Sequence, residues 1–534
     1  MIVLGLEGTA HTVSCGIVDE GHILSNSSRT YLNPNGGIHP REAAVHHAEN
    51  IYDVIKEALT SSGTSLSDID LISYSRGPGL GPCLRIVATA ARSLAIKSAK
   101  PIVGVNHPLG HVEIGRKLTG ASDPVMLYVS GGNTQIISHI GGRYRVMGET
   151  MDIGLGNLLD KLGRDLGYPF PGGPAIEKLA KDGHKLLSLP YSVKGMDTSF
   201  SGIYTASREL LRKGERAEDV CFSVQEYTFS MLLEVLERGL HQTSKSEILL
   251  AGGVARNQRL RGMINDLCSD LGIKAYVTDD AYCMDNGAMI AQAGLLMFKN
   301  GMQDTVDAAT VDQRYRIDEV EAPWISRSDG EIAEFRGAES LIQKGEFRGR
   351  SVIRKIRIGK KYRNPDLDRN IRTVRLRNEV GLILRFQDAG ARAPVVYDID
   401  TEELSITYEK IEGHTLRTFI LNQENNLHEV LFSIGSGIGK VHGIKMTHGD
   451  LTTANILISS DFQAYFIDPS MGKSDSGTED MAVDLFLFME SLKASSANSA
   501  ELFGEFMKGY KSAFGKWSEV VETMSRLEMR RRYV

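Results

Sequence analysis

Short apolar runs rich in Val, Ile and Leu alternate with longer amphipathic stretches over the first part of the chain, up to about residue 323. Apolar runs bounded by turn residues are typical of buried strands, and the stretch 42–58 has the spacing of a helix. This alternation predicts an α/β protein with mostly buried sheets. The expected strands lie at 2–4, 71–74, 102–105, 125–129 and 247–250.

The alternation breaks between residues 322 and 336, where Pro323 and Trp324 precede a polar run without periodicity. A stretch of this kind is typical of a linker. A chain of 534 residues is also longer than one compact core usually organises. We therefore expect a first domain over 1–323, a linker over 324–336 and a second domain, α/β or α+β, over 337–534.

Glycine-rich turns follow predicted strands at three places in the first part. Glu7-Gly8-Thr9-Ala10 ends the first strand, Ser130-Gly131-Gly132-Asn133-Thr134 ends a later one, and Gly252-Gly253 leads into a polar helix start at Asn257. Backbone N–H groups and hydroxyls in such turns can hold a phosphate. A single turn is also compatible with a purely structural role, but three in this order favour a nucleotide site.

Two histidines follow the predicted strand at 102–105, in Asn106-His107-Pro108-Leu109-Gly110-His111. Proline is tolerated in the first turn of a helix, and a helix that begins here sets both imidazoles on one face, where they can reach one metal ion. Because the chain has 14 histidines, the pair is also compatible with chance. A zinc protease is disfavoured, since Pro108 occupies the position of its Glu base.

The order of these turns resembles the actin, hexokinase and heat-shock ATPase superfamily, in which two ribonuclease-H-like halves enclose a nucleotide. Nearly all of residues 1–325 resemble, more specifically, the universal tRNA threonylcarbamoyladenosine transferase family, which includes the catalytic subunit of the KEOPS complex. Glu7 stands where the sugar kinases and ATPases of the superfamily usually have Asp, which argues against ordinary ATP hydrolysis. The motifs that carry the closer resemblance are Leu4-Gly5-Leu6-Glu7-Gly8-Thr9-Ala10, Arg76-Gly77-Pro78-Gly79-Leu80, Gly104-Val105-Asn106-His107-Pro108-Leu109-Gly110-His111, Tyr128-Val129-Ser130-Gly131-Gly132-Asn133-Thr134 and Arg314-Tyr315-Arg316-Ile317-Asp318-Glu319-Val320.

This resemblance implies an iron or zinc ion whose ligands fall on His107, His111, Tyr128 and Asp285. It implies that threonylcarbamoyl passes from threonylcarbamoyl-adenylate to N6 of the adenosine immediately 3′ of the anticodon, in tRNAs that read ANN codons. Tyr128 as a core aromatic residue and Asp285 as a helix cap remain alternatives, as do solvated helix positions for some of the others. The residues implied to hold the adenylate are Glu7, Tyr128, Ser130, Gly131, Gly132, Asn133, Asp160, Gly173, Glu177 and Asn257.

The second part contains the residue pattern of a protein kinase. Lys355 lies in a strand-like run, where a kinase lysine grips the ATP phosphates, and Glu379 in the following helix is its expected ion-pair partner. Lys360 and Lys361 compete with Lys355 for this role. The other expected residues are Asp450 as the catalytic base, Asn455 and Asp468 as magnesium ligands, and Gly345 as a nucleotide-binding glycine.

About residues 336–534 resemble the small atypical serine/threonine kinase of the KEOPS complex. The resemblance implies a bilobal kinase-like domain that binds magnesium and ATP. Asp468 is followed by Pro469-Ser470 rather than Phe-Gly, and no activation segment ending in Ala-Pro-Glu follows. Since that segment is the usual platform for a protein substrate, we expect ATP hydrolysis or autophosphorylation that regulates the complex, ahead of phosphorylation of another protein. The matching motifs are Lys360-Lys361-Tyr362-Arg363-Asn364-Pro365, Leu367-Asp368, Arg377-Asn378-Glu379, His448-Gly449-Asp450-Leu451-Thr452-Thr453-Ala454-Asn455 and the basic C-terminal tail.

Composition and charge indicate the cellular compartment and the kinds of partner to expect. The five cysteines contain no CxxC pair, which fits a reducing compartment, and no stretch has the length of a membrane span or the features of a signal peptide. We therefore expect a cytoplasmic protein without membrane contact. A net charge of -6 argues against general nucleic-acid coating, and no DNA partner is expected.

Lysine and arginine are nevertheless dense over 344–377 and recur at Arg526 and Arg530 to Arg532. Such clusters can bind the tRNA backbone, although solvated surface remains an alternative.

The sequence thus predicts a duplicated ribonuclease-H fold of the actin, hexokinase and heat-shock ATPase type, followed by a small protein-kinase-like domain. The expected partners are tRNA, ATP and other KEOPS subunits. A regulatory serine/threonine protein kinase whose N-terminal domain only binds nucleotide is the main alternative. A metalloprotease or an ATP-driven chaperone is the weaker one.

Overall fold

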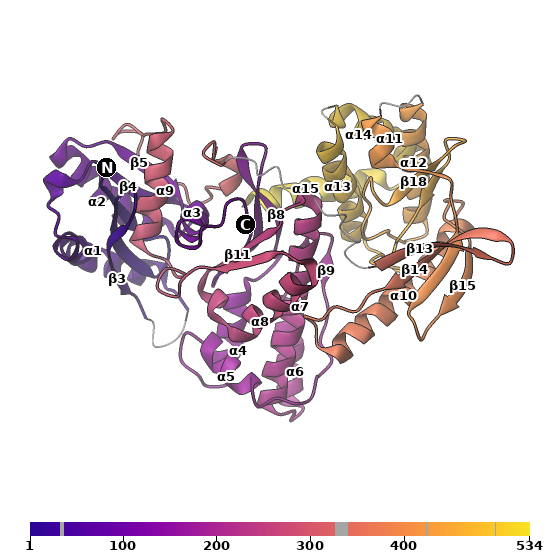
Figure 1. Ribbon diagram of the computed structural model, residues 1–534, viewed down its shortest axis with the longest axis horizontal. Helices are drawn as coiled ribbons and strands as arrows, with labels where there is room; N and C mark the ends of the chain where they lie inside the picture. Colours follow the sequence, from indigo (N-terminus) through magenta and orange to yellow (C-terminus); the bar gives the residue numbers. More distant parts are fainter. Residues whose placement is uncertain (33–36, 326–339, 423–425, 497, 534) are drawn as a thin grey trace. The chain divides into compact units, whose positions relative to one another are not determined.

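The computed structural model describes the chain up to Tyr533 apart from residues 33–36, 326–339, 423–425 and 497, and it describes side chains up to residue 527. The chain folds into two compact units (Figure 1). The predicted linker, 324–336, lies outside the described residues from 326 onward, as do the side chains of Arg530 to Arg532. None of the helices described is at once long and apolar enough to cross a membrane.

The first unit begins with a five-stranded sheet in the order β3-β2-β1-β4-β5. β1, β2 and β3 pair antiparallel, whereas β1, β4 and β5 pair parallel. All residues of β1, β2 and β5 are buried, which explains why apolar runs at these places predict strands. The elements are β1 (Val3–Glu7), β2 (Thr12–Val18), β3 (Ile23–Thr30), α1 (Pro40–Ser62), β4 (Leu71–Gly77), α2 (Gly81–Ser98) and β5 (Ile102–Asn106).

A second five-stranded sheet, in the order β12-β11-β6-β7-β8, repeats this topology. β6, β7 and β8 pair antiparallel, and β6, β11 and β12 pair parallel. The repeat confirms the duplicated α/β architecture predicted from the sequence. The elements are α3 (His107–Thr119), β6 (Val125–Val129), β7 (Thr134–Ile140), β8 (Arg143–Glu149), α4 (Leu155–Asp165), α5 (Gly173–Ala180), β9 (Val193–Lys194), β10 (Asp197–Thr198), α6 (Ser201–Arg212), α7 (Ala217–Thr243), β11 (Glu247–Ala251), α8 (Gln258–Leu271) and β12 (Lys274–Val277).

Helix α9 (Gly287–Lys299) packs backbone to backbone against the first sheet. A Cβ atom on Gly5 would lie 2.3 Å from the backbone N of Ala291, and one on Gly287 would lie 2.2 Å from the backbone N of Gly16. Only glycine permits so close an approach. The contact holds the start of α9, and Asp285 just before it, beside β1 and β2.

Three residues from the second part of the sequence, Lys361–Arg363, belong to the first unit. The Tyr362 side chain is fully buried, and its hydroxyl donates to Glu237 Oε2 at 3.3 Å. Arg363 Nη2 lies 2.7 Å from Glu234 Oε2, and both side chains are buried. Both glutamates lie on α7, so this helix offers carboxylates to a segment that precedes α10 (Pro365–Asp388).

The second unit combines a four-stranded antiparallel sheet, β13-β14-β16-β15, with α10, a three-stranded sheet and a group of helices. Together these elements confirm the predicted kinase-like fold. They are β13 (Ser340–Phe347), β14 (Arg350–Arg357), α10, β15 (Val396–Asp400), β16 (Ser405–Glu409), β17 (Gly413–Thr415), α11 (Leu416–Leu421), α12 (Leu427–Gly443), β18 (Ile456–Ser459), β19 (Ala464–Phe466), α13 (Thr478–Ser495), α14 (Ser499–Ala513) and α15 (Trp517–Tyr533).

The basic stretch 344–377 does not form one open cationic surface. Lys355, Arg357 and Arg363 are buried, and each pairs with a carboxylate. Arg354 and Arg372 also pair with carboxylates, in Glu403 and Asp368. These cations are engaged within the fold, which weakens the interpretation of the whole stretch as a tRNA-binding patch.

Candidate active sites

The first glycine turn fixes a buried carboxylate behind a histidine. Oε1 of Glu7, the last residue of β1, accepts hydrogen bonds from the Thr9 backbone N at 2.7 Å and from Thr9 Oγ1 at 2.5 Å. Glu7 Oε2 lies 3.2 Å from His107 Nδ1. A carboxylate at the remote nitrogen orients the ring and directs the other nitrogen toward a metal position.

His107 and His111 face one carboxylate from the same side of α3. The side chain of Asn106 caps this helix by accepting from the Leu109 N–H at 3.1 Å, and the helix begins at His107, which confirms the predicted start. Asp285 Oδ1 lies 3.4 Å from His107 Nε2 and 3.3 Å from His111 Nε2. The donor atoms of these three side chains lie within 4.8 Å of one another.

Tyr128 completes the group from β6. Its hydroxyl lies 3.2 Å from His107 Nε2, and its ring is fully buried beside His111, with ring centroids 4.9 Å apart. The four residues implied as metal ligands by the sequence resemblance therefore meet at one place. Two imidazoles, one carboxylate and one phenol suit a buried iron or zinc ion.

The charges in this group are mutually dependent. Burial opposes protonation of His107 most strongly, but Glu7, Tyr128 and Asp285 outweigh it and raise the pKa of His107 well above its ordinary value. Burial disfavours ionised Asp285, yet the two histidines hold its pKa well below the usual range. Burial lowers the pKa of His111 and raises that of Tyr128. The ionised Asp285 therefore attracts a positive charge, which is the His107 proton here and would be a metal ion when one is bound.

The second glycine turn closes directly after β6. Ser130 Oγ accepts from the Asn133 N–H at 3.2 Å, and the Ser130 N–H donates to the Asn133 carbonyl at 2.8 Å. The start of α4 packs on this turn so closely that a Cβ atom on Gly156 would lie 2.5 Å from the Ser130 carbonyl oxygen. The turn, which includes Gly131 and Gly132, therefore lies just beyond Tyr128.

The other residues implied to bind the adenylate lie in contacts that join helices. Asp160 Oδ1 on α4 accepts from the Gly172 N–H at 2.8 Å, next to Gly173 at the start of α5, and burial raises the pKa of Asp160. Glu177 Oε1 on α5 accepts from the Gln258 N–H at 2.9 Å. Asn257 caps α8. Each has a structural hydrogen bond, so nucleotide contact stays a prediction for them.

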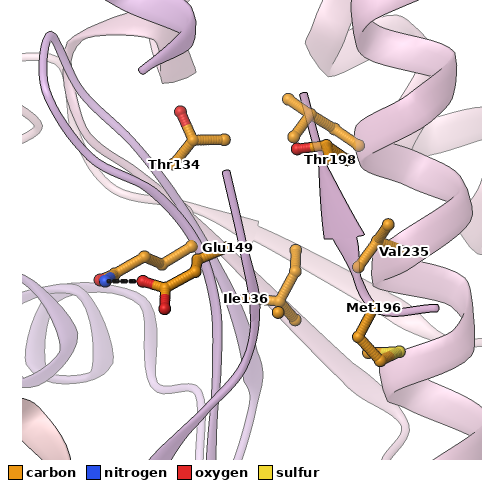
Figure 2. A pocket seen from close by; sticks show the side chains of 9 residues that line it. Thr134, Ile136, Glu149, Met196, Thr198 and Val235 are labelled. Atoms are coloured by element: carbon orange, nitrogen blue, oxygen red, sulfur yellow. Dashed lines mark hydrogen bonds between the residues drawn. The ribbon is translucent and has the colours of Figure 1, made fainter. Parts of the chain in front are cut away.

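A small open pocket lies beside β7, between Thr134, Glu149 and residues of β10 and α7 (Figure 2), and its empty space is about 180 Å³ even with the solvent at its open side included. Its walls are mostly apolar, from Ile136, Met196 and Val235, and Glu149 accepts a hydrogen bond from Gln135 at 3.2 Å. Sites for drug-sized ligands are usually about 300–1,000 Å³. This pocket is too small for an adenylate.

In the second unit, Lys355 contacts two carboxylates. Its Nζ lies 2.9 Å from Glu379 Oε1 and 2.8 Å from Asp468 Oδ2. The predicted lysine, helix glutamate and metal-binding aspartate are therefore brought together. Lys361, which the sequence left as a competitor, pairs with Asp270 of the first unit instead, and Lys360 precedes it outside the strand.

The expected catalytic loop positions two further residues. Asn455 Nδ2 donates to Asp450 Oδ2 at 2.9 Å and to the Asp450 carbonyl at 2.9 Å. The loop backbone is held by Asp484 on α13, which accepts from the His448 and Gly449 N–H groups at 2.6 and 2.8 Å. Gly345 lies on β13 opposite Val352, exposed on the same sheet as Lys355.

Three residues of this site were missed by reasoning from the sequence: Arg357, Tyr408 and Asp484. Arg357 carries a signal, because it lies two positions after Lys355 on the same strand and thus on the same face. Tyr408 and Asp484 carry none, since their roles depend on pairing across the sheet and on packing of α13.

Comparison with known proteins matches both units. Residues 22–292 match the family described as tRNA N6-adenosine threonylcarbamoyltransferase, and residues 342–481 match the RIO domain family. A protein of Thermoplasma acidophilum is 53% identical over 534 residues, and one of Methanothermobacter thermautotrophicus is 45% identical over 540 residues. Both alignments cover 100% of this chain and 100% of the relative, and both relatives are named "Probable bifunctional tRNA threonylcarbamoyladenosine biosynthesis protein".

Proposed function

The chain belongs to the family of bifunctional tRNA threonylcarbamoyladenosine biosynthesis proteins, and from this premise we propose how its two units divide the work. The first unit is the transferase. It passes threonylcarbamoyl from threonylcarbamoyl-adenylate to N6 of the adenosine 3′ of the anticodon in tRNAs that read ANN codons. The observation that carries this proposal is the convergence of His107, His111, Tyr128 and Asp285 in one buried cluster.

In this reaction a bond forms between N6 and the carbamoyl carbon, the bond from that carbon to the phosphate oxygen breaks, and AMP leaves while N6 loses a proton. His107, His111, Tyr128 and Asp285 would hold iron or zinc, which supplies Lewis acidity toward the threonylcarbamoyl group. Glu7 keeps His107 in its ligating orientation through Nδ1. The main contribution of the chain is then to position the donor and the acceptor.

The adenylate is proposed to lie along the second glycine turn. The turn offers the N–H groups of Gly131 and Gly132 and the Ser130 hydroxyl just beyond Tyr128, while the Ser130 and Asn133 N–H groups bond within the turn. Asp160, Gly173, Glu177 and Asn257 lie on the helices that follow. N–H groups at tight turns and helix starts favour phosphate.

The second unit is a RIO-type kinase unit, and we propose that it binds ATP with magnesium and regulates the tRNA reaction. Lys355 would hold the phosphates, Asn455 and Asp468 the magnesium ion, and Asp450 would act as the base. Since no activation segment ending in Ala-Pro-Glu follows Asp468, ATP hydrolysis or autophosphorylation is the favoured activity. Other KEOPS subunits are the proposed partners, and the cytoplasm is the proposed location, a reducing compartment that fits the five free cysteines.

The test supplies purified full-length chain with tRNA, threonine, bicarbonate, ATP, a threonylcarbamoyl-adenylate synthase and KEOPS subunits, and measures the modified nucleoside by mass spectrometry. His107→Ala and His111→Ala should abolish the product, because each removes an imidazole from the cluster. His22→Ala, at a histidine whose side chain is 82% exposed, is the matched control. Phosphate transfer to an added protein without any modified nucleoside would instead favour a regulatory protein kinase.

A further inference from the structure

Two cations lie side by side on the face of β14 that meets Glu379. Lys355 and Arg357 are two positions apart, so both side chains project to the same face of the strand. They are 6% and 3% exposed. A strand that buries two cations next to each other must bring carboxylates to both, since an unpaired buried charge is strongly unfavourable.

Glu379 on α10 supplies one of these carboxylates, and it has three donors. Its Oε1 accepts from Lys355 Nζ at 2.9 Å and from the Tyr408 hydroxyl of β16, and its Oε2 accepts from Arg357 Nη2. Glu379 is 1% exposed. Arg357 and Tyr408 together therefore hold both oxygens of Glu379 even without Lys355.

Asp468 supplies the second carboxylate, and it shares the same two cations. Its Oδ2 lies 2.8 Å from Lys355 Nζ, and its Oδ1 lies 3.8 Å from Arg357 Nη2. Two positive and two negative charges thus form one network. Tyr408 belongs to it as a neutral hydroxyl, since burial and the neighbouring Glu379 raise its pKa well above the usual value.

Lys355 serves both carboxylates, and in a kinase site it must also contact the nucleotide phosphates while its ion pair with the helix glutamate stays in place. We propose that Arg357 is a positioning residue of the nucleotide site: it shares the charge of Glu379 with Lys355 and so keeps Glu379, and with it α10, in place while Lys355 contacts the phosphates. The inference rests on the proposed binding of magnesium and ATP by the second unit.

This arrangement has a consequence for control of the second unit. Where one lysine alone holds the helix glutamate, displacement of the helix switches a kinase off. Here Arg357 and Tyr408 fix the glutamate independently of the lysine, so the site is kept assembled without an activation segment.

The experiment compares Arg357→Met, Arg357→Lys and Glu379→Gln in the full-length chain, with magnesium-dependent binding of a fluorescent ATP analogue and the KM and kcat of ATP hydrolysis as readouts. In Arg357→Met, Glu379 and Asp468 compete for Lys355, and the KM for ATP should rise about tenfold or more, the effect of losing one charge-assisted hydrogen bond. Arg357→Lys keeps a charge and should recover part of the affinity. Arg354→Met is the matched control, since Arg354 lies next to Lys355 on the other face and pairs with Glu403.

A double variant separates positioning from general support of the fold. If Arg357 acts through Glu379, adding Arg357→Met to Glu379→Gln should change the KM no further, because the competing carboxylate is already neutral. Effects that add, or an Arg357→Met chain that binds ATP like the Arg354→Met chain, would overturn the inference. A thermal unfolding midpoint lowered in Arg357→Met with unchanged KM would also overturn it. Failure of the unchanged chain to bind magnesium-ATP would overturn the proposed role of the second unit itself.

Discussion

His47 is fully buried on α1, and neither of its ring nitrogens has a hydrogen-bond partner. Burial, helped by the neighbouring His46, lowers its pKa from 6.5 to about 4. A Cβ atom on Gly8 would lie 3.0 Å from the His47 ring, so the histidine packs directly on the first glycine turn. The stability of that turn is therefore linked to the charge of one side chain.

We expect acid to destabilise the first unit through His47. The unfolded histidine binds a proton below pH 6.5, whereas the folded one does so only near pH 4. The stability that neutral His47 contributes to the fold is therefore complete above pH 6.5 and is lost as the pH falls through 4. The loss in free energy of unfolding reaches roughly 3 kcal/mol. The thermal unfolding midpoint of His47→Gln should vary less between pH 6.5 and 4 than that of the unchanged chain. The same slope in both would contradict this, and His22→Gln serves as control.

Metal removal should act at the same scale, on the ligands themselves. Because the carboxylate of Asp285 is balanced by the two histidines, a chelator should leave the fold intact and abolish threonylcarbamoyl transfer. Titration of the stripped chain with Fe²⁺ and Zn²⁺, followed by metal analysis and nucleoside mass spectrometry, identifies the ion that restores it. The Asp285→Asn chain should bind this metal ion at least about tenfold more weakly, because loss of a charged ligand costs more than about 1.4 kcal/mol. Full transfer by a chain free of metal would contradict the proposed site.

At the scale of elements, the strands and the start of α3 were predictable because they depend on local signals. Buried strands require apolar runs, and Pro108 after a capping Asn106 marks a helix start. Lys361–Arg363 was not predictable in this way. Lys-Lys-Tyr-Arg has the composition of an exposed basic segment, and the burial of its Arg363 depends on Glu234, which is 129 positions away in the sequence.

The α7 carboxylates make Arg363 a structural part of the first unit. Arg363→Met leaves Glu234 with Arg238 and Tyr191 but without its buried partner. Breaking a buried ion pair costs about 3–5 kcal/mol, and the remaining partners should reduce this loss to about 2–3 kcal/mol. The loss in free energy of unfolding is measured by urea titration of the full-length chain, with hydrogen exchange of α7 as the local readout.

Lys361→Ala is the matched control for that experiment. Lys361 pairs with Asp270 at the surface, where its side chain is 76% exposed. Exposed ion pairs contribute about 0–1 kcal/mol, so this variant should unfold nearly as the unchanged chain does. Equal losses in both variants would mean that the segment is held by its backbone rather than by the Arg363 charge.

At the scale of the whole molecule, each proposed site draws all its residues from one unit. Glu7, His107, His111, Tyr128 and Asp285 lie in the first, and Lys355, Glu379, Asp450, Asn455 and Asp468 lie in the second. The metal cluster therefore needs no side chain of the kinase unit to form. The sequence resemblance predicted this division, whereas the limits of the linker stay a prediction.

A single round of transfer should consequently be independent of the kinase site. We expect the Lys355→Met chain to form the modified nucleoside at the rate of the unchanged chain when it is mixed with tRNA and preformed threonylcarbamoyl-adenylate and neither substrate exceeds the protein. Repeated turnover in the presence of ATP should be slower, because regulation is lost. His107→Ala should fail in both formats. Loss of the single round in Lys355→Met would show that the second site takes part in the chemistry.

The position of Lys361–Arg363 has a consequence for splitting the gene. A cut in the segment between the two units leaves an N-terminal fragment that ends before residues which belong to its own fold. Such a fragment would expose buried glutamates of α7 and would recover its full stability only when the other fragment supplies Tyr362 and Arg363. Coexpression of the second fragment should therefore raise the stability of the N-terminal one by returning these two side chains to α7.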